Sequence, residues 1–261
     1  MDLRLIGKRV FVSGSTQGIG YAIAATCAGE GASVVLNGRS ARQVEEAVDR
    51  LKRHAPGADV SGLAADLSDP GQTRELLEAL GAVDVLVNNL GHFGVAPFAE
   101  IEDGQWREYF EVNTMSGVRL SRRLLPGMLE AGWGRIIFIG TESAVDVPGD
   151  MIHYGATKAA ALAVSNGLSK LTRGTGVTVN TVLGGPTYSD GVAAAVEQIA
   201  SAQGASTEDL KSSLVRSTSL LGRFIEPDEI AGLVSYLASP LSSAINGAAL
   251  RADGGVLPTI V

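Results

Sequence analysis

The chain has 261 residues, is 45% apolar and carries a formal net charge of −7, with no long basic run. This length accommodates one large domain with a substantial core. The acidic balance argues against nucleic acid or an anionic membrane surface as the main partner.

The N-terminus and the single cysteine indicate the compartment. Residues 1–5 contain no apolar stretch, and no apolar run approaches the roughly 18 residues of a membrane span, so we predict neither a signal peptide nor a span. Cys27 has no partner for an internal disulfide, and its Ala-rich helical surroundings favour a buried structural thiol. We expect a cytoplasmic protein.

Residues 9–12 form a predicted buried strand, which leads directly into the glycine-rich stretch 13–20 and a helix to about residue 29. Gly14, Gly18 and Gly20 follow the spacing Gly-x-x-x-Gly-x-Gly. A glycine-rich turn before a helix lets backbone N–H groups and the helix dipole face an anion, typically a pyrophosphate. An ordinary tight turn is the alternative, but in this context we predict nucleotide binding.

The second predicted strand, residues 32–36, ends near Arg39. In sheets of this kind the end of that strand meets the adenosine ribose, where an acidic residue binds NAD and repels the 2′-phosphate of NADP. No acid occurs from residue 36 to 43, and the Arg39 guanidinium can donate to a 2′-phosphate. The sequence therefore predicts NADP, with NAD possible, unless Arg39 is only a solvated residue at a strand end.

Two further strands, 59–65 and 83–87, end in residues suited to ligand binding. Asp66 and Leu67 follow the first strand, and the Asp66 carboxylate could accept a hydrogen bond from an adenine amino group. The alternative is a plain helix cap, which the sequence 68–70, Ser-Asp-Pro, also suits. The sequence 88–91, Asn-Asn-Leu-Gly, follows the second strand, at the edge where such sheets bind ligands.

A long helix is predicted from Gln105 to Glu130, with Asn113 in its middle. Asparagine is disfavoured inside a helix, so its side chain is expected to join a network or to have a function. The fifth strand, residues 135–139, leads to Thr141 and Ser143.

The next helix carries Tyr154 and Lys158. Residues four apart lie on one helical face, so the phenol and the ammonium can point into one site. A free tyrosine has a pKa of about 10, and a nearby cation lowers that pKa by favouring the phenolate. The pair therefore indicates a general acid or base.

The remaining segments complete an alternation of strands and helices. Residues 177–182 are the sixth strand, residues 226–238 a helix and residues 247–252 the last strand. The irregular helical pattern from about 189 to 221 is typical of a mobile flap over a site. Without any linker, the chain is predicted to be a single domain, 1–261, of the α/β class, with a doubly wound parallel sheet.

Together these motifs resemble those of the short-chain dehydrogenase/reductase family over the whole chain. The resemblance implies a Rossmann-type sheet of about seven strands and hydride transfer between NAD(P) and a carbonyl or alcohol. The matching residues are Ser13, Gly14, Gly18, Ile19, Gly20, Asp66, Leu67, Asn88, Asn89, Leu90, Gly91, Asn113, Tyr154, Lys158, Asp253, Gly254 and Gly255.

The resemblance also implies roles. Tyr154 would donate a proton to the carbonyl oxygen, Lys158 would lower its pKa and bind the nicotinamide ribose, and Asn113 would hold a helix kink and a water of a proton relay. Thr141 stands 13 residues before Tyr154, where the family usually has serine, and Ser143 is the alternative hydroxyl.

Other residues are assigned to the cofactor and the substrate in the same way. The cofactor-binding residues implied are Gly14, Ser15, Gln17, Gly18, Ile19, Gly20, Arg39, Asp66, Leu67, Asn89, Gly91, Tyr154, Lys158, Gly185, Thr187 and Ser189. The expected walls of the substrate pocket are His92, Phe93, Val145, Met151 and Tyr188.

Two departures from the family pattern change bulk and flexibility near the site. Leu90 replaces the usual alanine beside the cofactor, and Gly184-Gly185 replaces Pro-Gly at the hinge of the flap.

We therefore expect an NADP-preferring carbonyl reductase or alcohol dehydrogenase, a homodimer or homotetramer, for a small to medium organic substrate. A 3-oxoacyl carrier-protein reductase is an alternative, although a net charge of −7 would repel an acidic carrier protein. A catalytically silent NADP-binding sensor or scaffold is another, although Tyr154, Lys158 and Asn113 are all present. Three dispersed histidines and one cysteine predict no metal site.

Overall fold

A computed structural model describes residues 2–203 and 206–259. Within these ranges seven parallel strands form one sheet in the order β3-β2-β1-β4-β5-β6-β7. The order reverses between β1 and β4, and sheets of this kind bind ligands outside the carboxyl ends of the strands at such a switch point. The strands are β1 Arg9–Val12, β2 Ser33–Gly38, β3 Val60–Ala64, β4 Val85–Asn88, β5 Trp133–Thr141, β6 Gly176–Gly184 and β7 Ala249–Ala252.

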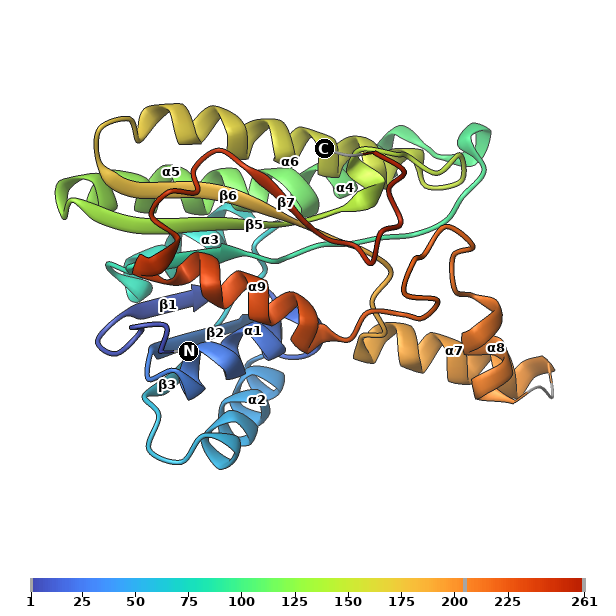
Figure 1. The fold of residues 1–261 in the computed structure, drawn as a ribbon, viewed down its shortest axis with the longest axis horizontal. Coiled ribbons are helices and arrows are strands. Elements are labelled where there is room, and N and C mark those ends of the chain that lie inside the picture. The colour runs from blue at the N-terminus through green and yellow to red at the C-terminus, as the bar shows by residue number, and fades with distance from the viewer. Residues whose placement is uncertain (1, 204–205, 260–261) are drawn as a thin grey trace.

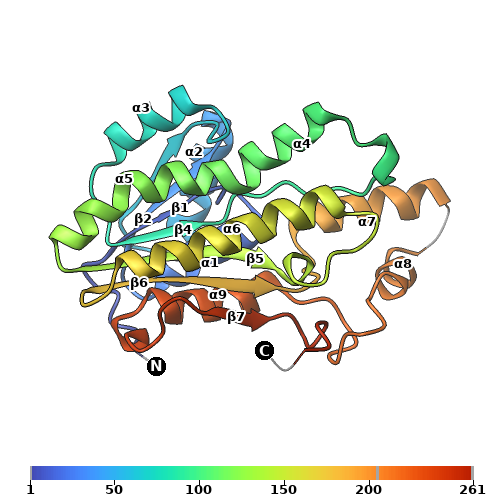
Figure 2. The same ribbon diagram turned by 90° about the horizontal axis from the view of Figure 1, so that it is seen from above.

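Helices cover both faces of the sheet (Figures 1 and 2). One face carries α1 Gly18–Gly29, α2 Ala41–His54 and α9 Pro227–Ala238, and the other carries α3 Pro70–Leu80, α5 Ser116–Glu130 and α6 Ile152–Leu171. This arrangement confirms the predicted doubly wound α/β fold.

The core is divided by the sheet into two layers. Val10 and Val12 of β1 pack toward α1 and α9, whereas Phe11 between them packs toward the opposite helices, as the period of two along a strand requires. Cys27 is fully buried beside Ser235, and burial raises the pKa of its thiol to about 11. It therefore stays protonated, as expected for a structural thiol.

The predicted helix 105–130 is not continuous. Helix α4, Asp103–Phe110, is followed by a π-helical turn, Glu111–Met115, before α5 begins. The wider turn inserts a bulge at Asn113, and such bulges are frequent at functional sites. The sequence pattern did not reveal this break, because the apolar spacing on either side of it is still helical.

The segment predicted as a flap forms α7, Asp190–Gln203, and α8, Thr207–Ser213, which lie beside the carboxyl edge of the sheet (Figure 1). Gly204 and Ala205 of that segment lie outside the described residues. No helix in the described ranges is long and apolar enough to cross a membrane.

Candidate active site

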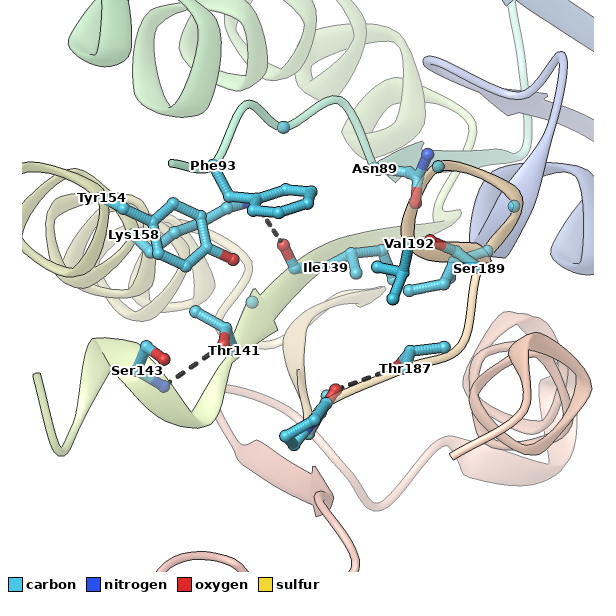
Figure 3. Close-up of a pocket in the computed structure, with 18 of the residues that line it drawn as sticks. Asn89, Phe93, Ile139, Thr141, Ser143, Tyr154, Lys158, Thr187, Ser189 and Val192 are labelled. Atoms are coloured by element: carbon cyan, nitrogen blue, oxygen red, sulfur yellow. Dashed lines mark hydrogen bonds between the residues drawn. The ribbon is translucent and has the colours of Figure 1, made fainter. Parts of the chain in front are cut away.

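A cavity of about 470 Å³ opens at the carboxyl ends of β1, β4, β5 and β6, between the Tyr154 helix and the flap (Figure 3). Residues far apart along the chain, from Gly14 to Phe224, meet there because the topology brings them to one edge of the sheet. The sequence-predicted residues that line it are Gly14, Gln17, Gly18, Ile19, Gly20, Asn89, Gly91, His92, Phe93, Thr141, Ser143, Met151, Tyr154, Lys158, Gly185, Thr187 and Ser189.

Several predicted residues do not reach the cavity wall. Ser15 is buried behind it, where its hydroxyl donates to the Val12 carbonyl, and Leu67 lies in the core. Val145 is 47% exposed just after the 3-10 turn that follows β5. Tyr188 packs its ring against Phe224, with Lys211 over its face. Val145 and Tyr188 are therefore not pocket walls in this structure.

The glycine-rich turn before α1 is shaped for close approach. Gly14 and Gly18 have φ of 59° each, a left-handed conformation that favours glycine. A side chain at Gly20 would collide with the Asn89 amide and the Gly14 carbonyl. The Asn89 amide itself donates to the Ser13 and Gly14 carbonyls at 2.9 and 2.8 Å, which fixes the turn. These features fit a dinucleotide pyrophosphate at the helix N-terminus.

The flap already contacts this turn. The Gly18 N–H donates to the Asp190 carboxylate at 2.6 Å, and Asp190 begins α7. The free N–H groups and the dipole at a helix N-terminus attract any anion. The Asp190 carboxylate is therefore held by the same interactions that would hold a pyrophosphate.

The predicted adenosine end of the site lies along the ends of β2 and β3. Arg39 is exposed and makes no hydrogen bond or ion pair with the residues that the structure describes. The Asp66 carboxylate accepts from the Ser68 N–H and hydroxyl, whereas Asp69 caps α3. The helix cap predicted at residues 68–70 is therefore present, and a contact between Asp66 and adenine stays a prediction.

Asn113 sits behind the cavity and joins two of its walls. Its side-chain oxygen accepts from the His92 N–H at 2.7 Å, and its amide donates to the His92 carbonyl at 2.9 Å and to the Thr157 hydroxyl at 3.0 Å. The π-helical turn thus connects the loop after β4 to the helix of Tyr154. The implied helix kink is present, and the water relay stays a prediction.

Tyr154 and Lys158 both face the cavity from α6 (Figure 3). The Lys158 ammonium donates to the Ile139 carbonyl at 3.1 Å, and burial lowers its pKa to about 8. Burial raises the pKa of Tyr154 to about 12, helped by the negative charge of Glu142 and opposed by a hydrogen bond with Thr141. The expected lowering of the Tyr154 pKa by Lys158 is therefore absent here, because burial dominates.

Of the two histidines near the site, His92 lines the cavity and His153 does not. His153 is 2% exposed, and its ring contacts Tyr109 at 4.1 Å between centroids. Burial lowers its pKa, with a smaller contribution from His92, so it is neutral at neutral pH. The His92 ring also packs edge-on against Tyr109. These contacts support a packing role for both rings rather than acid–base chemistry.

Two charged residues that line the cavity were not predicted from the sequence. Glu142 is 3% exposed and lies between the two candidate hydroxyls: Thr141 Oγ1 donates to it at 2.5 Å and Ser143 Oγ at 3.2 Å. Arg216, from the loop after α8, pairs with the same carboxylate at 3.3 Å. An acidic residue between two hydroxyl residues at the end of a strand is a pattern that could have pointed to Glu142. No sequence pattern could have pointed to its ion pair with Arg216, because the two residues are far apart in the sequence.

The structure favours Thr141 over Ser143 as the hydroxyl that contacts substrate. Thr141 lies at the end of β5 and faces the Tyr154 phenol, whereas Ser143 lies farther from it (Figure 3). We predict that Thr141→Val lowers kcat/KM by at least about 10-fold, because one hydrogen bond to the substrate oxygen is lost, and that Thr141→Ser is mild.

The control for this comparison is Ser143→Ala. It should cost less than Thr141→Val when steady-state kinetics of the variants are measured with one substrate. The opposite order would assign the hydroxyl role to Ser143.

Fold and site together define a dinucleotide-dependent oxidoreductase: a doubly wound sheet, a glycine-rich turn at its switch point, and a Tyr–Lys pair with a nearby hydroxyl. Residues 14–257 match a family model described as enoyl-(acyl carrier protein) reductase. The chain belongs to the short-chain dehydrogenase/reductase family.

Known proteins resemble the chain over its full length. It is 45% identical to the uncharacterised oxidoreductase YvaG of Bacillus subtilis, over 100% of both chains. It is 31% identical to the 3-oxoacyl-[acyl-carrier-protein] reductase FabG of Escherichia coli, over 96% of this chain and 97% of that protein. The crystal structure of L-sorbose reductase from Gluconobacter frateurii, complexed with NADPH and L-sorbose, superimposes with a TM-score of 0.95 at 31% identity, covering 100% of both chains.

Proposed function

We propose that this protein is an NADP-preferring reductase or dehydrogenase that interconverts a carbonyl and a secondary alcohol in a small to medium organic substrate. The observation that carries the proposal is the placement of Tyr154, Lys158 and Thr141 on one wall of a cavity that also contains the glycine-rich turn. L-sorbose reductase, with NADPH bound, supports the choice of cofactor and of a small substrate.

NADP, when bound, supplies the hydride, and the protein supplies position and a proton. Tyr154 donates its phenolic proton to the substrate oxygen in reduction and accepts it back in oxidation. Its raised pKa keeps that proton in place at neutral pH. The Thr141 hydroxyl orients the same oxygen, and Lys158, one turn along α6 from Tyr154, faces the ribose side of the site.

Two alternatives from the sequence are weaker. FabG of E. coli and L-sorbose reductase are each 31% identical to the chain, so identity does not separate them, but a net charge of −7 disfavours an acidic carrier protein. A catalytically silent NADP-binding scaffold would have no need of a buried Lys158 beside Tyr154, because burying a charged amine is costly.

The proposal is tested by following NADPH and NADH oxidation with L-sorbose, methyl acetoacetate, benzaldehyde and a 3-oxoacyl thioester carried on acyl carrier protein. Turnover of a free small carbonyl compound, faster with NADPH, is expected. Turnover of the carrier-bound thioester alone would establish the carrier-protein reductase, and NADPH binding without any turnover would indicate the scaffold.

We also propose that the protein assembles in the cytoplasm as a homodimer or homotetramer through α5 and α6. Small residues on α6, such as Ala156 and Ala160, permit close helix packing. Light scattering at micromolar concentration is expected to give a mass of two or four chains. A monomer alone would contradict the assignment.

A further inference from the structure

Glu142 is a buried acid next to Thr141 and Tyr154, and none of the catalytic or cofactor-binding roles proposed above involves it. Its side chain is only 4% exposed. An ionised carboxylate is costly to bury unless it is paired and hydrogen-bonded. Three donors satisfy it here: the hydroxyls of Thr141 and Ser143 on its own turn, and the guanidinium of Arg216.

The bond from Thr141 has a consequence for its orientation. A threonine hydroxyl has one proton, and Thr141 Oγ1 lies 2.5 Å from the Glu142 carboxylate, which accepts it. The Tyr154 phenol is a second acceptor within reach, because a hydrogen bond with Thr141 acts to lower its pKa. Thr141 Oγ1 also accepts from the Ser143 N–H at 3.2 Å. To donate to a substrate carbonyl oxygen, Thr141 must turn its proton away from Glu142. The substrate oxygen and Glu142 therefore compete for the same proton.

Arg216 connects the flap to Glu142 through an ion pair. It follows α8, its side chain is 35% exposed, and it lines the cavity. Thr141 and Glu142, by contrast, lie at the end of a central strand. A cation paired with a carboxylate reduces the charge that the carboxylate presents to its other donors. The ion pair thus links the position of the flap to the strength with which Glu142 holds the Thr141 proton.

We propose that Glu142 is a positioning residue that couples the flap to Thr141 through Arg216: the Arg216–Glu142 ion pair weakens the hold of Glu142 on the Thr141 proton, so that the substrate oxygen can take it. This inference rests on the proposed function, because it concerns the orientation of a substrate carbonyl. The competing role for Arg216 is direct binding of an acidic group on the substrate, with Glu142 only holding the guanidinium in place.

Two matched pairs of substrates separate these roles. L-sorbose and 5-keto-D-gluconate share one carbon skeleton and differ at a terminal carbon, which is CH₂OH in one and a carboxylate in the other. Methyl acetoacetate and acetoacetate form a second neutral and anionic pair. The variants are Arg216→Met, Glu142→Gln and the double variant. The matched control is Arg223→Met, since Arg223 pairs with Glu229 at the surface and lies outside the active-site cavity.

Arg216→Met is expected to lower kcat/KM by at least about 10-fold, and equally for both members of a pair, because the carboxylate without its cation holds the Thr141 proton more strongly. The NADPH dissociation constant should stay within about two-fold of wild type. Adding Glu142→Gln should restore kcat/KM to within about three-fold of wild type, because the amide carries no charge. Glu142→Gln alone should raise KM and leave kcat within about two-fold, and Arg223→Met should change neither.

Any of three results would overturn the coupling. A double variant as slow as Arg216→Met would show that the two residues act independently. A loss confined to the carboxylate-bearing substrates would show that Arg216 binds them directly. Equal losses of kcat/KM in every variant, accompanied by a lower Tm, would show that Glu142 has only a structural role.

Amide hydrogen exchange tests the link without turnover, and so separates this inference from the proposed function. In the protein itself, Glu142→Gln is expected to raise exchange at residues 210–219 by at least about three-fold, because the flap loses its ion pair with the turn that follows β5. Arg223→Met should leave that exchange unchanged. Unaltered exchange in Glu142→Gln would refute the link, whereas failure of wild type to reduce any of the four substrates would count against the proposed function alone.

Discussion

Tyr154→Phe is expected to lower turnover by about 10²–10⁴-fold while the dissociation constant for NADPH stays near wild type. The phenylalanine ring fills the same space beside Phe93, 6.4 Å away between ring centroids, but has no proton to transfer. Steady-state rates and a fluorescence titration with NADPH measure the two effects. Tyr236→Phe is the matched control, since Tyr236 lies on α9 outside the cavity.

The pH dependence provides a second readout of Tyr154. Its pKa is raised to about 12, so the proton needed for carbonyl reduction is present throughout the neutral range. Alcohol oxidation needs the phenolate, so its rate is expected to rise with pH below that value. A variant that kept more than about a tenth of wild-type activity, or the same rise with pH, would show that another group transfers the proton.

Arg39→Ala is expected to weaken NADPH binding by about 1.5–3 kcal/mol, or roughly 10- to 150-fold, and to change NADH binding much less. The reason is the 2′-phosphate, which only NADPH carries and to which an exposed guanidinium at the end of β2 can donate. Dissociation constants for both cofactors measure this difference directly.

Arg42→Ala is the control for Arg39. Arg42 lies in the same stretch, but its guanidinium pairs with Glu46 one turn along α2 and is 84% exposed. Equal losses for NADPH and NADH in Arg39→Ala would show that Arg39 does not contact the 2′-phosphate. A larger loss in Arg42→Ala would transfer that role to Arg42.

Local patterns in the sequence predicted the strands and their order along the chain, whereas the resemblance to the family supplied most of the residues that line the cavity. Strands β1, β2, β4, β5 and β6 are mostly buried and read as short apolar runs bounded by turn residues, which are visible without a structure. The glycine-rich turn was equally accessible, since Gly14 and Gly18 have left-handed backbones that other residues adopt with strain. The i, i+4 spacing of Tyr154 and Lys158 placed both on one face of α6.

The break in the helix at Asn113 depended on tertiary contacts. The Asn113 side chain bonds the backbone of His92 and the hydroxyl of Thr157, and these partners lie on other elements. A π-helical turn is formed where such bonds offset its poorer helical geometry, so local spacing could not indicate it.

The protonation of the site was likewise decided by the tertiary structure. From spacing alone, Lys158 was expected to lower the pKa of Tyr154, but burial and the charge of Glu142 raise it. The partner of Glu142 is Arg216, 74 residues farther along the chain (216 − 142). Sequence patterns carry the periodicity of each element, whereas a carboxylate's burial and its partners depend on which elements the fold brings together.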